Sequence, residues 1–332
     1  MMKKTLLIPF SLFLLLWAGN IYAFEPLGVP DPDEVEFESD FDINEKVIDL
    51  GKTLFFDNRL SINKSQSCAT CHNPDLGFGD GMAKGIGALG GKLGRNVPHI
   101  YNLSWNNRFF WDGRAKTLEE QALGPIQSKA EMNMDIPTLV RRLQQVPAYR
   151  LKFKKAFGDE AITDKTIAAA LAAFEATITV TNTPFDQFTK GNHAALSPSA
   201  KRGLKLFKKK ARCVKCHDGA NFTDVGFHNI GVKDLDKTAD VGRYKIDPAK
   251  NLRGAFKTPG LRNTAFTAPY MHNGSLGSLE EVVRFYNRGG EKSPNKDKLM
   301  KKLNLSEQEI FDLVAFLGAL SEPLNITRPV IP

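Results

Sequence analysis

The chain has 332 residues, of which 25% are charged and 42% hydrophobic, and its formal net charge is +8. This length is too great for one small domain and fits two domains of ordinary size. The basic excess is modest, and no basic stripe interleaved with aromatic residues accompanies it, so the sequence gives no indication of nucleic-acid binding.

Residues 1–23 have the pattern of a cleavable export signal. Lys3 and Lys4 precede an apolar run from Leu6 to Trp17, and Ala23 provides a small residue at the expected cut. The apolar run is too short to span a membrane. We therefore expect a periplasmic protein whose mature chain begins at Phe24, with no membrane anchor after cleavage.

Two short motifs use every cysteine of the chain. Residues 68–72 read Cys-Ala-Thr-Cys-His, and residues 213–217 read Cys-Val-Lys-Cys-His. In such a motif the thiols bond covalently to the haem vinyl groups and the histidine supplies an axial nitrogen to the iron. Zinc or a redox dithiol would also suit a single Cys-x-x-Cys pair, but the histidine in both copies favours haem. The predicted attachment residues of two haem c groups are Cys68, Cys71, His72, Cys213, Cys216 and His217.

The segment after each motif is repeated with a shift of 161 residues. Residues 98–102 (PHIYN) recur as residues 259–263 (PGLRN). This similarity predicts a tandem duplication. Residues 182–197 contain Pro and Gly and are typical of a boundary. We expect an N-terminal haem domain at 24–190 and a C-terminal haem domain with a C-terminal tail at 191–332.

The predicted secondary structure is mainly helical. Thr117 and Ser278 each begin a Thr/Ser-x-x-Glu sequence, which predicts a capping box at the start of a helix. Apolar residues at helical spacing predict further helices, and strands are hard to find. These helices cover residues 136–145, 164–180, 198–209 and 307–320. Residues 228–254 are predicted to form a long loop, and the C-terminal tail is expected to lie back on the first domain.

The duplication predicts that the two haems differ on the side opposite their histidine. Under the 161-residue shift, Tyr286 corresponds to Pro125. A phenolate oxygen can ligate ferric iron, whereas proline has no side-chain donor, so one iron would be closed and the other open. Two alternatives stay open, because Tyr286 also fits a half-buried position on an amphipathic helix and Met271 offers a thioether ligand.

These motifs resemble those of the bacterial dihaem cytochrome c peroxidases and their MauG-like relatives. The resemblance covers most of the mature chain. Besides the haem motifs, it rests on residues 95–98 (RNVP), 110–114 (FWDGR), 118–126 (LEEQALGPI), 131–132 (EM) and 267–275 (TAPYMHNGS). It implies a mainly α fold of two tandem cytochrome c-like haem domains. Hydrogen peroxide would be reduced at the first haem, with electrons supplied through the second.

The resemblance implies roles for three residues near the first haem. The distal glutamine of the family falls on Gln121 and its distal glutamate on Glu131. A carboxylate can move a proton between the two oxygens of peroxide, and an amide can orient the substrate. Trp111 matches the tryptophan that lies between the haems and relays electrons.

The resemblance also implies a calcium ion and a partner protein. The calcium ligands would be Asn96 and the backbone carbonyls of Thr267 and Pro269, and such oxygen ligands suit a hard cation. The electron donor would be a small periplasmic protein, either a cytochrome c or a cupredoxin. A homodimer is compatible with the sequence.

Two positions depart from the commoner pattern of the family. Many of these peroxidases have a histidine that closes the first haem until the other haem is reduced, and this chain has Ala88 at that place. His99 is nearby but lies beyond the loop concerned. The methionine that usually ligates the second haem is replaced by Tyr286, and an anionic oxygen ligand lowers the reduction potential. We therefore expect a reaction with peroxide that needs no prior reduction.

Three functions stay open at this point. The leading one is a peroxidase. The second is oxidation of another protein, as in MauG-like enzymes, although the surface tryptophan of that branch is replaced by Ala211. The third is a non-catalytic electron carrier, which would need a second protein ligand on the first haem. Neither Ala88 nor Pro125 can provide that ligand.

Overall fold

The computed structural model describes residues 26–31, 33, 35, 37–235 and 239–332. The predicted export signal, residues 1–23, lies outside these described residues. Within the described parts of the chain, every helix is too short or too polar to cross a membrane.

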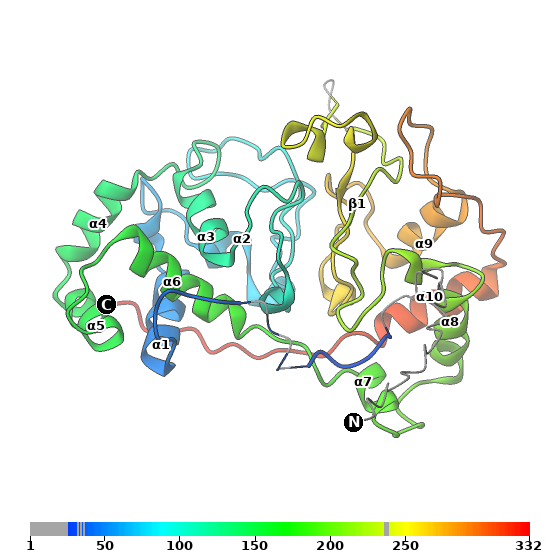
Figure 1. Cartoon of the computed structure of the whole chain (residues 1–332), viewed down its shortest axis with the longest axis horizontal. Coiled ribbons are helices and arrows are strands. Elements are labelled where there is room, and N and C mark those ends of the chain that lie inside the picture. The colour runs from blue at the N-terminus through cyan, green and yellow to red at the C-terminus, as the bar shows by residue number, and fades with distance from the viewer. Residues whose placement is uncertain (1–25, 32, 34, 36, 236–238) are drawn as a thin grey trace, which may run out of the picture.

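The described chain forms two groups of helices on either side of a central region of loops (Figure 1). The first group contains α1 (Glu45–Phe55), α2 (Cys68–Cys71), α3 (Leu118–Gln127), α4 (Ile136–Gln144), α5 (Pro147–Phe157) and α6 (Asp164–Ala176). The second group contains α7 (Pro184–Thr189), α8 (Pro198–Lys208), α9 (Leu279–Asn287) and α10 (Glu307–Gly318). The two strands β1 (Phe227–His228) and β2 (Phe256–Lys257) pair antiparallel beside the loops. The prediction of a mainly helical fold is confirmed.

Each group is built on one close crossing of two helices, α1 with α6 and α8 with α10. A glycine lies at each crossing. A Cβ atom added to Gly51 would lie 1.7 Å from the carbonyl oxygen of Ala170, and one added to Gly203 would lie 2.0 Å from that of Asp312. Any side chain there would therefore separate the helices and open the two apolar cores. The cores are distinct clusters, one reaching Val180 and the other beginning at Phe185.

Helix α7 packs with the second group. Phe185 contacts Phe222 and Phe316 with ring centroids 5.3 and 5.8 Å apart. Asp186 is fully buried and pairs with the Arg262 guanidinium at 2.8 Å. The core of the second group thus begins before residue 190, although the sequence boundary places this helix in the first domain.

Positions related by the 161-residue shift have matching backbone features. Asn102 and Asn263 both adopt the left-handed region, with φ of 54° and 58°. Thr117 and Ser278 both accept a hydrogen bond from the backbone N–H three residues later, as predicted for N-caps. Neither copy forms a full capping box. The Glu120 and Glu281 carboxylates accept the backbone N–H of the residue before the N-cap, at 2.8 Å and 2.6 Å respectively, and not that of the N-cap itself.

The predicted helices are present, with one end displaced. The helix predicted at 164–180 ends at Ala176, because Asn102 binds the following segment through the Ile178 carbonyl and the Val180 amide. The predicted loop at 228–254 holds two short 3₁₀ turns, Arg243–Lys245 and Lys250–Leu252. The helices α1, α2, α5 and α7 were not predicted.

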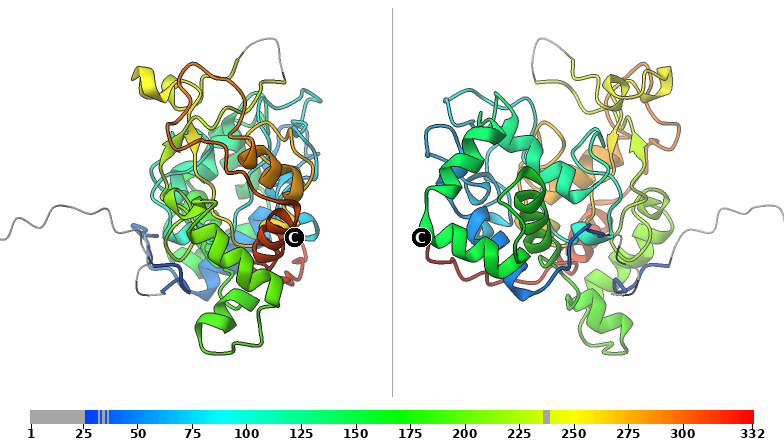
Figure 2. Two further views of the ribbon diagram at one scale, coloured as in Figure 1. Left: turned by 90° about the vertical axis from the view of Figure 1, so that its right-hand side faces the viewer. Right: turned by 60° about the vertical axis from the view of Figure 1, so that its left-hand side comes forward.

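The C-terminal tail crosses back to the first group, as expected (Figures 1 and 2). Leu324 and Ile326 pack against the apolar core of the first group. Arg328 then pairs with Asp75 at 2.6 Å. The tail therefore connects the two groups at the side away from the central loops.

Candidate active site

Each group of helices contains one large cavity. The cavity of the first group has a volume of about 620 Å³ and is lined by Cys68, Cys71 and His72. The cavity of the second group has a volume of about 770 Å³ and is lined by Cys213, Cys216 and His217. Both volumes lie in the range of protein cofactor sites. The two predicted attachment motifs therefore each border a space suited to a haem.

The motif histidines are oriented as iron ligands. The Nδ1 atom of His72 lies 3.2 Å from the Phe78 carbonyl oxygen, and that of His217 lies 2.9 Å from the Phe222 carbonyl oxygen. An N–H donated from Nδ1 leaves Nε2 as the free lone pair, the usual arrangement of a metal-bound imidazole. Burial lowers the pKa of both side chains, so that the imidazoles stay neutral and able to ligate iron.

The four cysteines are free of disulfides. Burial raises the pKa of Cys71 to about 11 and that of Cys213 to about 12, so the sites disfavour thiolates. A thioether sulfur carries no charge and suits such surroundings better than a zinc-bound thiolate. The geometry therefore fits haem attachment and argues against a Cys-x-x-Cys zinc site.

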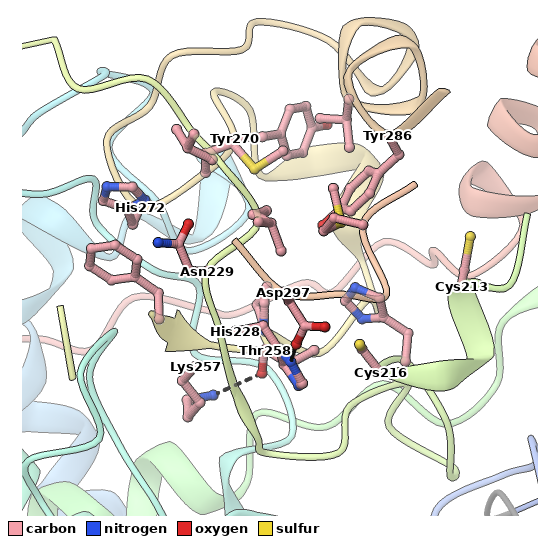
Figure 3. Close-up of a pocket in the computed structure, with 18 of the residues that line it drawn as sticks. Cys213, Cys216, His228, Asn229, Lys257, Thr258, Tyr270, His272, Tyr286 and Asp297 are labelled. Carbon is pink, nitrogen blue, oxygen red and sulfur yellow. Dashed lines mark hydrogen bonds and ion pairs between the residues drawn. The ribbon is translucent and has the colours of Figure 1, made fainter. Parts of the chain in front are cut away.

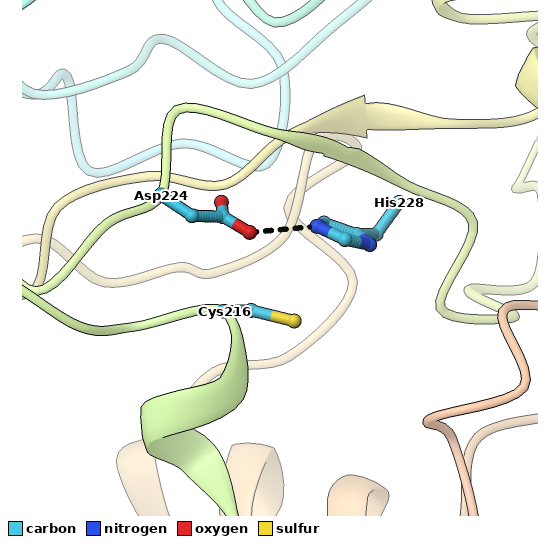
Figure 4. Close-up of side chains that lie close together, drawn as sticks. All are labelled: Cys216, Asp224 and His228. Atoms are coloured by element: carbon cyan, nitrogen blue, oxygen red, sulfur yellow. Dashed lines mark hydrogen bonds and ion pairs between the residues drawn. The ribbon is translucent and has the colours of Figure 1, made fainter. Parts of the chain in front are cut away.

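Cys216, Asp224 and His228 form a cluster whose potential ligand atoms lie within 4.8 Å of one another (Figure 4). His228 is held between the carboxylates of Asp224, at 2.9 Å, and Asp297, at 2.6 Å. The hydrogen bond that the imidazole donates to Asp224, together with the other groups around the ring, raises the pKa of His228 to about 11. A protonated imidazole has no lone pair for a metal, so the cluster is an ion pair beside a haem-attachment sulfur.

The wall of the first cavity brings together three of the predicted residues. Gln121 and Pro125 come from α3, and Glu131 follows that helix. Burial raises the pKa of Glu131, while the Ser128 side chain and the Arg114 charge partly oppose this effect. The wall therefore offers an amide and a carboxyl group beside a proline that cannot ligate iron.

Arg114 is a residue of this site that reasoning from the sequence left without a role. Its guanidinium lies 3.4 Å from the centroid of the Phe110 ring and 3.0 Å from Asp112 Oδ1. The Asp112 carboxylate also accepts from Arg95 at 2.8 Å. These contacts fix a positive charge near Glu131. The only signal for this role in the sequence was its place in the FWDGR motif.

The second cavity has a different lining. Tyr286, from α9, borders it (Figure 3). Met271 borders it as well. Burial raises the pKa of Tyr286, and Cys213 and Cys216 lie close enough to contribute. A free phenolate is therefore disfavoured there, and coordination to a ferric ion would stabilise it. The structure brings both candidate ligands of the second haem to the same cavity.

Trp111 lines both cavities. Its indole N–H donates to the Asn96 carbonyl at 2.9 Å. Its ring meets that of His272 edge-on with centroids 6.5 Å apart, and His272 stacks on Phe256 at 3.6 Å. The predicted relay residue thus lies in the wall that separates the two cavities.

Ala88 and His99 give the first iron no additional ligand. The backbone of Ala88 is held against Glu131 by an N–H···O bond of 2.8 Å, and a methyl group carries no donor. Both ring nitrogens of His99 are engaged by the backbone, Nδ1 by the Tyr101 N–H at 3.3 Å and Nε2 by the Gly260 carbonyl at 3.1 Å. His99 is therefore not free to bind iron.

Comparison with known proteins gives the same assignment. Residues 45–194 match the family model described as di-haem cytochrome c peroxidase. The chain is 45% identical over 305 residues to methylamine utilization protein MauG of Methylorubrum extorquens, covering 91% of this chain and 86% of that protein. The chain belongs to the di-haem cytochrome c peroxidase family.

Two further similarities extend over nearly the whole chain. Cytochrome-c peroxidase IdrP1 of Denitromonas iodatirespirans is 38% identical over 341 residues, covering 93% of this chain and 90% of that one. The crystal structure of a MauG-like protein associated with microbial copper homeostasis has a TM-score of 0.79 at 32% identity, covering 92% of this chain and 96% of its own. As a member of the di-haem cytochrome c peroxidase family, the chain is an oxidoreductase that uses peroxide and two haem c groups.

The three residues that the family resemblance assigns to calcium all border the second cavity. The Asn96 side chain donates to the Met82 carbonyl at 3.0 Å, which leaves its oxygen available. Among the described residues, no hydrogen-bond donor reaches the carbonyl oxygens of Thr267 and Pro269. One amide oxygen and two carbonyl oxygens are thus free of donors among the described residues, and oxygen atoms of this kind suit a hard cation such as calcium.

Proposed function

We propose that this protein is an exported, periplasmic peroxidase that reduces hydrogen peroxide at the first haem and receives electrons through the second. The observation that carries this proposal is the difference between the linings of the two cavities. The first lining includes Gln121, Glu131 and Pro125, and the second includes Tyr286 and Met271. One site is built to admit a small substrate, and the other is built to hold a ligated iron.

The bound haem would supply an iron that binds and reduces peroxide, and the protein would position the substrate and move its proton. The Gln121 amide can donate to a peroxide oxygen and orient it. The Glu131 carboxylate can accept the proton of one oxygen and deliver it to the other, which departs as water. The Ser128 side chain and the Arg114 charge favour the carboxylate of Glu131 and partly oppose the effect of burial on its pKa.

The second haem would carry electrons from a small periplasmic protein, a cytochrome c or a cupredoxin. We assign Tyr286 as its second axial ligand, with Met271 as the rival, and Trp111 as the relay in the wall between the sites. An anionic oxygen ligand would lower the reduction potential of this haem. Such an arrangement favours oxidation of both haems by peroxide without prior reduction.

We assign the two halves to an internal duplication of a cytochrome c-like domain. The matching φ angles of Asn102 and Asn263, the equivalent N-caps and the glycine at each helix crossing support this assignment. We also assign calcium to Asn96, Thr267 and Pro269, where it would fix the region between the domains.

Oxidation of another protein's side chains is the second candidate. It is supported by the 45% identity with MauG and by Tyr286. Ala211, which replaces the surface tryptophan of that branch, is only 6% exposed and lines the second cavity. The chain therefore has no aromatic side chain at the position of that surface tryptophan, which favours the peroxidase.

Measurements of steady-state turnover test the choice between a peroxidase and an enzyme that oxidises another protein. The dihaem protein would be mixed with peroxide and a reduced c-type cytochrome or cupredoxin, and donor oxidation would be followed optically. We expect repeated turnover with two donor molecules oxidised per peroxide, and a large loss of rate in Glu131→Gln. Consumption of peroxide that oxidises side chains of an added protein but no reduced donor would exclude the peroxidase in favour of the second candidate.

A further inference from the structure

The wall between the two cavities contains a charged residue that the proposed function does not use. Among the described residues that line both cavities, three are titratable: His99, Asp240 and Lys257. Lys257 is on β2, and its backbone N–H donates to the Trp111 carbonyl at 2.8 Å. The lysine is therefore fixed beside the predicted electron relay.

The other two titratable groups contribute no uncompensated charge to this wall. His99 has both ring nitrogens in backbone hydrogen bonds, and burial lowers its pKa to about 4, so it is neutral. Asp240 accepts from Arg95 at 2.7 and 3.0 Å, and Arg95 also binds Asp112. Arg114 also pairs with Asp112, so these two cations and two anions neutralise one another locally.

Lys257 lacks such compensation. Its ammonium group has three donors, and the one hydrogen bond it makes among the described residues is a long one, 3.3 Å, to the Thr258 carbonyl. None of the described carboxylates lies within ion-pair distance of it, and Asp224, which influences it most, is already bound to His228. Burial lowers the pKa of Lys257 to about 8. Lys257 is half-buried in the wall of the two cavities. A cation that has lost much of its water without gaining a partner is costly, so the site calls for an anion.

The geometry of haem attachment indicates which anion reaches this point. The cysteine thioethers fix the vinyl-bearing edge of a haem, and its two propionate carboxylates are on the opposite edge. Lys257 lies across the second cavity from Cys213 (Figure 3). A haem attached at Cys213 and Cys216 would therefore direct its propionates toward the wall that contains Lys257.

We propose that Lys257 is a propionate-binding residue shared by the two haem sites, and that its charge raises the reduction potentials of both haems. The position 161 residues earlier, Asn96, supports a shared role. Asn96 and Lys257 make equivalent backbone bonds of 2.8 Å, to the His272 and Trp111 carbonyls respectively, but the Asn96 side chain is uncharged and bound to Met82. The protein thus places one half-buried cation in a wall that borders two cavities.

A positive charge near both irons favours the addition of an electron to each. Potentiometric titration of the dihaem protein therefore tests the proposal. Lys257→Met should lower both midpoint potentials. Lys257→Arg should keep both close to the wild-type values, because the charge and the donors are kept. If Lys257 merely filled space, these two variants would have the same midpoint potentials.

Matched controls come from exposed lysines that border one cavity each. Lys245 lines the first cavity and Lys233 the second, and changing either to Met should move at most the potential of its own haem. Lys257→Gln removes the same charge if Lys257→Met fails to acquire two haems. Unchanged potentials in the charge-removed variant, or a shift of only one haem, would overturn the shared role. The inference rests on the presence of two haems and not on the proposed reaction, so it can fail or hold independently of peroxidase activity.

Discussion

Glu131 shows how one side chain can be prepared for proton transfer. Burial disfavours its carboxylate, and the Ser128 side chain and Arg114 favour it, with burial the larger effect. The net result is a pKa above the ordinary value of 4.5. A group of this kind can both accept and release a proton nearer to neutral pH than an exposed glutamate.

Glu131→Gln should slow the reaction with peroxide by about 10²- to 10⁴-fold, the usual loss when a general acid–base residue is removed. In the wild type, the rate should fall as the pH is lowered through the raised pKa of Glu131, because the acceptor becomes protonated, so this acid limb should lie above pH 4.5. Stopped-flow rates over a pH series measure both effects, with exposed Glu160→Gln as the control. A variant with an undiminished rate would remove Glu131 from the mechanism.

The two candidate ligands of the second haem can be separated by substitution. Tyr286→Phe removes the phenolic oxygen and keeps the ring in α9, whereas Met271→Leu removes the sulfur and keeps an apolar side chain. We expect Tyr286→Phe to change the low-spin spectrum and to leave the high-spin signal of the first haem largely intact. Electron paramagnetic resonance of the diferric protein reports both signals. If Met271→Leu changes the low-spin signal instead, the sulfur is the ligand.

At the scale of elements, α7 is fixed by a buried ion pair. Arg262 and Asp186 are 1% and 0% exposed, and the guanidinium also donates to the carbonyls of Ala220 and Gly28. One group therefore connects a short helix, the loop after the second haem motif and the N-terminal segment. Loss of the Arg262 guanidinium would leave the Asp186 carboxylate buried without a charged partner.

Arg262→Met should destabilise the second group by about 3–5 kcal/mol, the usual cost of breaking a buried pair by removing one partner. Denaturant unfolding of the dihaem protein, followed at the second haem by Soret circular dichroism, measures this loss. The matched control is Arg328→Met, which breaks the exposed pair with Asp75 and should have a much smaller effect, because water screens that pair. Equal losses in the two variants would mean that burial does not set the strength of this interaction.

The elements that could be predicted are those whose signals are local. Capping residues and apolar spacing located the starts of α3, α4, α6, α8, α9 and α10 correctly. The end of α6 depends on Asn102, which is 78 residues from Val180 along the chain. The packing of α7 depends on Arg262, which is 76 residues from Asp186. Such contacts belong to the tertiary structure and leave no periodic pattern in the sequence.

The residues of the candidate site also divide into those with a signal in the sequence and those without one. Motif spacing identified the haem-attachment residues, and the family resemblance located Gln121 and Glu131. The sequence did not show that both ring nitrogens of His99 are occupied or that Lys257 borders both cavities. These properties depend on loops from two halves of the chain meeting at one wall.

At the scale of the whole molecule, the two halves have related backbones but different chemistry. Trp111 and His272 are 161 residues apart and meet at the same wall, where His272 is also stacked on Phe256. Pro125 and Tyr286 are related by the same shift, and they border different cavities. In the proposed function, equivalent positions thus border the substrate site in one half and ligate iron in the other.

This asymmetry predicts how the resting enzyme begins its reaction. A peroxidase whose first haem is closed by a histidine needs one electron and a loop movement before peroxide can reach the iron. Here the loop at 85–93 is held by backbone bonds from Ala88 to Glu131 and from Leu93 to Gly85, each 2.8 Å long, and it presents no ligand. His99, the other nearby imidazole, is already bound on both nitrogens.

The diferric protein should therefore react with peroxide on first contact, without a lag and without pre-reduction. Rapid mixing of fully oxidised protein with one equivalent of peroxide, followed in the Soret region, measures this directly. The control is the same protein reduced by one electron before mixing, which should show no additional activation. A lag that disappears only after reduction would mean that another side chain closes the first site, because neither Ala88 nor Pro125 has a donor atom that an electron could displace.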